Sequence, residues 1–66
     1  MDIADELINL AGRGDIGDFN RVTDIMNILH NQRELKGNDF FALEEGKKYV
    51  REMQKLLDQE KQRQDQ

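Results

Sequence analysis

The stretch that decides the fold is residues 39–57, DFFALEEGKKYVREMQKLL. When its residues are placed 100° apart, as in an α-helix, most of the apolar side chains fall on one side. These residues are Ala42, Leu43, Tyr49, Val50, Met53, Leu56 and Leu57, and Gly46 lies among them. The chain has no proline and no glycine after Gly46, so nothing ends the helix before the C-terminus. We therefore expect a long C-terminal helix with one apolar face, capped by Asn38 or Asp39.

Part of this apolar face follows an a/d heptad for two repeats, through Leu43, Gly46, Val50, Met53 and Leu57. A coiled coil requires three or four heptads, so the spacing only suggests one. We expect the second half of the helix to outreach the rest of the protein and to leave Met53, Leu56 and Leu57 partly uncovered in a monomer. The residues expected to mediate self-association are Leu43, Val50, Met53, Leu56 and Leu57.

A shorter amphipathic helix is expected over residues 2–12, where the apolar side chains lie opposite the acidic ones. Asp2 is placed to cap this helix and Gly12 to end it. Residues 12–18, GRGDIGD, hold three of the five glycines. Because glycine readily adopts backbone conformations that other residues avoid, this segment predicts a turn or a short loop.

The next helix is expected to begin after Asp18, which can cap it, and to end at Gly37. Its apolar side chains cover close to half of the circumference, as in a central helix that touches two neighbours. The sequence therefore predicts an all-α fold: a three-helix bundle, or helical hairpin, with a long C-terminal helix. Residues 1–57 would form the single helical domain, and residues 58–66 a polar, Gln-rich extension, either a fraying helix or a disordered tail.

Composition limits the chemistry available to this chain. Its 66 residues include no cysteine and one histidine, which excludes disulfides, thiolate metal sites and an imidazole zinc site within one chain. A chain this short has a marginal core, for which self-association or docking on a partner is a common remedy. The net charge of −4 resides in residues 1–20, where five acidic side chains oppose one arginine. The negative net charge therefore disfavours a general affinity for nucleic acid, although it is compatible with a local basic patch.

The sequence also bears on where the protein acts. Its first residues are acidic, whereas a signal peptide begins with a basic segment. The longest apolar runs span only a few residues, which is far short of a membrane helix. The lack of cysteine fits a reducing compartment. We expect a soluble, cytoplasmic protein that does not contact membranes.

Two short motifs in the glycine-rich segment have structural explanations. Gly12, Gly14 and Gly17 spell G-x-G-x-x-G, but a dinucleotide site requires this pattern between a strand and a helix. Here it follows a helix, so it predicts an interhelical turn. The tripeptide Arg13-Gly14-Asp15 matches the sequence that integrins recognise on extracellular ligands, but no secretory feature accompanies it.

The polar residues do not form a catalytic pattern. Asp15, Asp18 and Asp24 do not follow the calcium-loop spacing, and capping and solubility explain them without chemistry. His30 lies at the border of the apolar arc of its helix, and the chain has neither serine nor cysteine for it to activate. We therefore expect a protein that is not an enzyme, with no catalytic residues, no metal site and no cofactor.

Two features of the C-terminal helix are candidates for binding a partner. Phe40 and Phe41 lie about 100° apart, so both cannot face the same core. One is expected to pack under the preceding turn and the other to be exposed as an anchor, unless both close a corner of the bundle. The second feature is a basic stripe made of Lys47, Lys48, Arg51 and Lys55. It suits contact with phosphates, with an acidic protein, with the acidic N-terminal helix or with the acidic end of a second copy, and it also fits an ordinary solvated flank.

The leading hypothesis is a non-enzymatic protein–protein interaction module that self-associates through its C-terminal helix and acts as a regulator, an inhibitor or an assembly factor. It would bind another protein through Phe40, Phe41 and the basic stripe. The alternative is a dimeric nucleic-acid-binding regulator in which two stripes combine. In size, acidity and lack of cysteine the chain resembles accessory proteins of bacteriophages and plasmids, a resemblance of type without a shared motif.

Overall fold

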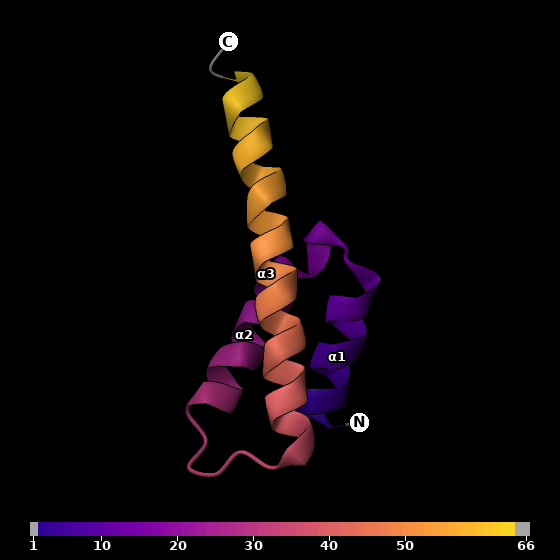
Figure 1. The fold of residues 1–66 in the computed structure, drawn as a ribbon, viewed down its shortest axis with the longest axis vertical. Helices are drawn as coiled ribbons and strands as arrows, with labels where there is room; N and C mark the ends of the chain where they lie inside the picture. Colours follow the sequence, from indigo (N-terminus) through magenta and orange to yellow (C-terminus); the bar gives the residue numbers. More distant parts are fainter. Residues whose placement is uncertain (1, 65–66) are drawn as a thin grey trace.

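The computed structural model describes the backbone of residues 2–64 and the side chains of residues 2–60. Within this part of the chain the elements are α1 (Ile3–Arg13), the short 3-10 turn η1 (Ile16–Asp18), α2 (Phe19–His30) and α3 (Gly37–Gln64). α1 and α3 run in the same direction, and α2 runs against both (Figure 1). The prediction of an all-α, three-helix bundle with a long C-terminal helix is confirmed.

The three helices come together at Gly46, near the middle of the bundled part of α3. A Cβ atom added to Gly46 would lie 2.9 Å from Sδ of Met26 in α2 and 3.3 Å from Cδ1 of Leu7 in α1. Side chains of both neighbouring helices therefore pack directly on the backbone of α3, and a Cβ atom at this position would have to displace the side chain of Met26. Glycine inside a helix is less stable than alanine by about 1 kcal/mol, and this close contact explains why glycine occupies position 46.

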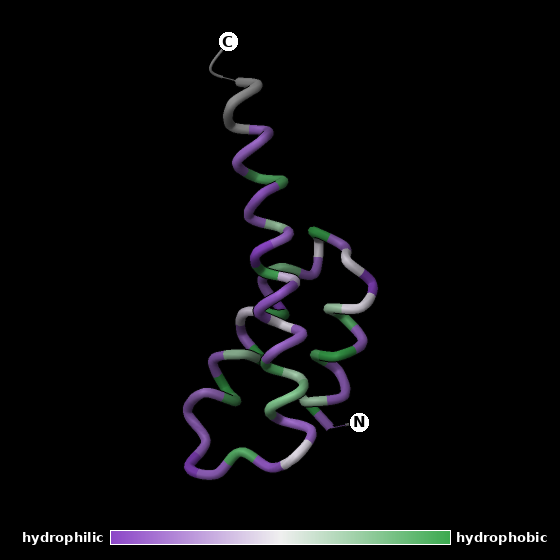
Figure 2. The backbone as a smooth tube through the Cα atoms, viewed as in Figure 1, coloured by the Kyte–Doolittle hydropathy of each residue, from purple (hydrophilic) through white to green (hydrophobic). Residues whose placement is uncertain are grey.

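The core lies along the side of α3 that faces α1 and α2. Its buried side chains are Ala4, Leu7, Val22, Ile25, Leu29, Ala42, Leu43, Tyr49 and Met53. α3 has 28 residues, a length of about 42 Å, whereas α1 has 11 and α2 has 12. The C-terminal part of α3 therefore extends beyond the bundle. Most of the residues there are hydrophilic, and they are interrupted by one hydrophobic segment (Figure 2).

Tyr49 joins the turn between α1 and α2 to α3. Its side chain is buried, its ring lies 6.3 Å from the ring of Phe19, and its hydroxyl donates a hydrogen bond to the backbone carbonyl of Asp15. Burial, together with the nearby charges of Asp18 and Asp15, raises the pKa of Tyr49 above its ordinary value. The sequence placed Tyr49 on the apolar face of the helix, but its bond to the turn could not be foreseen from periodicity.

The turn is built by Gly14 and Asp15. The expected helix end at Gly12 is wrong, because α1 continues through Arg13 and ends at Gly14, whose φ of 65° is left-handed. This conformation is costly for residues with a Cβ atom, which explains glycine at this position. The carboxylate of Asp15 then accepts a hydrogen bond from the backbone N–H of Gly17 at 3.0 Å. The G-x-G-x-x-G pattern is thus an interhelical turn.

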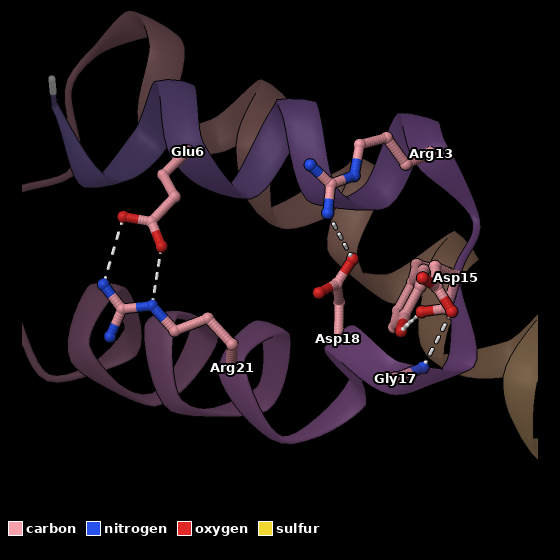
Figure 3. A network of polar contacts seen from close by, with 7 residues as sticks. Glu6, Arg13, Asp15, Gly17, Asp18 and Arg21 are labelled. Carbon is pink, nitrogen blue, oxygen red and sulfur yellow. Dashed lines mark hydrogen bonds and ion pairs between the residues drawn. The ribbon is translucent and has the colours of Figure 1, made fainter.

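Two ion pairs connect the segments on either side of this turn (Figure 3). Arg21 of α2 donates two hydrogen bonds to the carboxylate of Glu6, at 2.6 and 3.0 Å, and this contact lowers the pKa of Glu6. Arg13 contacts Asp18 at 3.1 Å, so Asp18 pairs with α1 and does not cap α2 with its side chain. Because all four side chains are partly exposed, the pairs orient the helices and add little stability.

The expected extension of the second helix to Gly37 is also wrong. α2 ends at His30, and Gly37 is the first residue of α3. The segment between them is polar except for Leu35, which packs against the core, so an extended helix would have had no apolar face to bury. α3 begins before Asn38 and Asp39, so neither is its N-cap as expected, but the carboxylate of Asp39 in the first turn accepts a hydrogen bond from the backbone N–H of Lys36 at 3.1 Å.

We expect Gly46→Leu to lower the free energy of unfolding by about 1–3 kcal/mol, because the added carbons overpack the contact with Met26 and Leu7. Gly46→Ala should cost less, since the gain in helix propensity offsets part of the displacement of the flexible Met26 side chain. Urea unfolding followed by circular dichroism measures both effects, with Lys47→Leu as an exposed control. Equal stability of Gly46→Leu and the control would contradict the close packing.

We expect Tyr49 to ionise only above its ordinary pKa of about 10, because burial and the nearby charges of Asp18 and Asp15 disfavour the phenolate. Absorbance at 295 nm reports this ionisation alone, since the chain contains one tyrosine and no tryptophan. The folded protein holds this proton more tightly than the unfolded chain. The contribution of Tyr49 to stability is therefore complete below pH about 10 and is lost as the pH rises through the raised pKa. Tyr49→Phe should remove that part of the pH dependence, and an unshifted titration would contradict the burial.

Candidate functional site

The six residues predicted to bind a partner are all exposed along α3, and Lys48 also borders the groove between α3 and the end of α1. These residues are Phe40, Phe41, Lys47, Lys48, Arg51 and Lys55. The exposed fraction is 59% for Phe40 and 54% for Phe41. The expectation that one phenylalanine packs under the preceding turn is wrong, since Leu35 packs against the core instead.

These side chains form two rows along α3, which run close to parallel because residues seven or eleven apart differ by about 20° in direction. The rows are Phe40, Lys47, Arg51 and Phe41, Lys48, Lys55. Each row begins with an aromatic ring at the N-terminal end of α3 and continues with cations. Glu44 lies between the rows. We call this surface the outer face of α3, with the residues Phe40, Phe41, Glu44, Lys47, Lys48, Arg51 and Lys55.

The cations of the outer face differ in how they are paired. Lys47 lies 3.6 Å from Glu44, and Lys55 lies 3.8 Å from Glu52. Both distances exceed a normal hydrogen bond, so these pairs hold the ammonium groups loosely. Among the side chains of residues 2–60, Lys48 and Arg51 make no ion pair. Their charges are therefore available to a partner.

The residues predicted to mediate self-association do not form one surface. Leu43 and Met53 are each only 5% exposed, so they belong to the core, and the expectation that Met53 is partly uncovered is wrong. The bundle reaches Met53 because the end of α1 packs beside it, and Ala11 and Gly14 line the same groove as Met53. Val50 is half-buried against the core. The self-association residues that α3 leaves exposed are Leu56 and Leu57.

Leu56 and Leu57 face a small apolar groove where α3 leaves the bundle. They are 50% and 44% exposed, and Ile16 of η1 is 43% exposed beside them. The groove has a volume of about 320 Å³ and is lined by Ile16, Leu56, Leu57, Gln59 and Glu60. Ile16 was not predicted from the sequence, because an isolated apolar residue in a glycine-rich turn carries no periodic signal.

A second open groove, of about 350 Å³, runs between the end of α1 and α3. It is lined by Ala11, Gly14, Glu45, Lys48, Tyr49, Glu52 and Met53. The hydroxyl of Tyr49 is already engaged with the carbonyl of Asp15. Among the described residues, no group of three or more histidine, cysteine or acidic side chains is arranged to hold a metal ion.

The remaining polar candidates have local roles. His30 is exposed in the last turn of α2, and Thr23 donates a hydrogen bond to the backbone carbonyl of Asn20. Asp15 and Asp18 stabilise the interhelical turn as described above, and Asp24 is exposed on α2. The interpretation of the acidic residues as capping and surface groups is therefore correct for Asp15 and Asp24, whereas Asp18 forms an ion pair.

Comparisons of the chain with protein-family models, curated protein sequences and solved structures found no match. Within residues 2–64, no helix combines the length and the apolar character that crossing a lipid bilayer requires.

Proposed function

We propose that this chain is a non-enzymatic protein–protein interaction module that binds its partner through the outer face of α3. The observation that carries the proposal is the exposure of Phe40 and Phe41 at 59% and 54% of their surfaces. Neighbouring aromatic side chains on a rigid helix are typical anchors of protein interfaces, because they bury a large area and lose little conformational freedom.

The energetics favour such an anchor. Complete burial of a phenylalanine side chain contributes about 1.5–3 kcal/mol, so covering the exposed half of each ring contributes about 1 kcal/mol. The cations that follow along the helix add charge complementarity and orient the partner. In this proposal the protein acts by occupying or joining another protein, as a regulator, an inhibitor or an assembly factor.

The apolar groove at Ile16, Leu56 and Leu57 supports a second interaction, the pairing of two copies through the exposed part of α3. A symmetric pair would place the same groove of each copy against the other. A stable interface of standard size buries about 800 Å² per partner, more than three partly exposed side chains provide. The pairing is therefore expected to be weak and to depend on protein concentration.

Replacing both phenylalanines tests the proposed binding surface. We expect Phe40→Ala/Phe41→Ala to abolish the capture of a specific partner from a lysate of the source cells and to leave helicity unchanged, because neither ring belongs to the core. The matched control is Ile28→Ala, which removes an exposed apolar side chain, 47% exposed, from α2. Quantitative mass spectrometry compares the captured proteins. An identical set of proteins on the wild type and the double variant would contradict the proposal.

Light scattering coupled to size exclusion tests the pairing of two copies. We expect the apparent mass of the wild type to rise with concentration and Leu56→Gln/Leu57→Gln to remain monomeric. Ile28→Gln, which adds the same polar group to a different exposed site, should behave as the wild type. A wild-type protein that is monomeric at every concentration would remove self-association from the account.

A further inference from the structure

On the outer face of α3, the aromatic residues and the basic residues lie at different positions along the helix axis. Phe40 and Phe41 occupy the first turns of α3. Lys48 lies about 10 Å farther along than Phe41, and Arg51 about 15 Å farther, at a rise of 1.5 Å per residue. A ligand that covers the rings and reaches these cations must therefore be elongated, with its apolar groups at one end.

The unpaired cations indicate the charge of that ligand. Within residues 2–60, Lys48 and Arg51 have no acidic partner in this structure, while Glu6 and Asp18 are paired with other arginines. A guanidinium group presents a planar fork of donors that matches a carboxylate in a bidentate geometry. An ammonium group provides a second, less directional contact.

The acidic residues among the cations distinguish a peptide from a surface of phosphates. Glu44 lies between the two rows, next to Phe40 in the following turn, and Glu52 lies beside Lys55. Nucleic acid and anionic lipid present continuous negative charge, which these carboxylates repel. A peptide can place its carboxylates opposite Lys48 and Arg51 and leave a neutral residue opposite Glu44.

The acidic helix α1 of a second copy offers a poorer match. Asp5 of α1 and Asp2 just before it are exposed, but the apolar residues beside them are buried, as Ala4 and Leu7 are, or only partly exposed, as Ile3 and Ile8 are. The acidic face of α1 therefore has no exposed apolar end that could cover Phe40 and Phe41.

We propose that the outer face of α3 binds an acidic peptide segment of another protein, with apolar side chains against Phe40 and Phe41 and carboxylates two to three helical turns away against Lys48 and Arg51. This inference rests on the proposed function, since it specifies the chemistry of the partner at the same surface.

Selection from a displayed library of random peptides, each of about 15 residues, tests the inference with the full chain as bait. We expect enrichment of peptides that combine an apolar cluster with separated acidic residues. A selected peptide should bind Lys48→Gln/Arg51→Gln at least about tenfold more weakly, because charged hydrogen bonds are lost. Binding to Arg33→Gln/Lys36→Gln, which removes two cations outside the outer face, should be unchanged. Selection on Lys48→Glu/Arg51→Glu should instead enrich basic peptides.

The outcomes distinguish a failure of the inference about the ligand from a failure of the proposed function. Peptides that require Phe40 and Phe41 but show no acidic bias would overturn the inference and leave the proposed function standing. A lack of any peptide that depends on these rings would overturn both. Binding to a short DNA duplex, or to phosphatidylserine-containing vesicles, that requires Lys48 and Arg51 would overturn the inference in favour of a phosphate ligand.

Discussion

The packing of two helices against the backbone at Gly46 is the contact on which the rest of this small structure depends. It brings α1 and α2 close to α3, with Leu7 and Met26 within 3.3 Å of the position that a Cβ atom would occupy. A bundle of this size has little apolar surface to bury, so close approach of its three helices is its main source of dispersion contacts. The bond from Tyr49 to the turn at Asp15 adds a polar tie to the same arrangement.

This packing divides α3 into two faces with different roles. The face that holds Ala42, Gly46 and Tyr49 is covered by the other two helices. The opposite face is exposed, with Lys48 at the edge of the groove beside α1, and it carries two phenylalanines that the core does not use. Solvation explains an exposed lysine, but it does not explain two neighbouring aromatic rings. The binding proposal follows from this division of the helix.

The predictability of the structure differs between its regular and irregular parts. Periodicity placed Leu7, Ile25 and Tyr49 on apolar faces, and all three are buried. It could not decide that α2 ends at His30, because the polar segment after it fits equally well on the wet side of a helix. The same difference applies to the candidate site. Periodicity predicted on which side of the helix the cations lie. The exposure of both phenylalanines could not be predicted, because it depends on the path of the loop between α2 and α3.

The most direct test of the account is a titration of the isotope-labelled protein with an enriched peptide, followed by amide chemical shifts in NMR spectra. The account predicts shifts along the outer face of α3, from Phe40 to Lys55, with the core residue Leu7 and the exposed Ile28 unaffected. Shifts confined to the groove at Ile16 and Leu57, or spread over the core, would show that the protein binds through another surface or by opening its bundle.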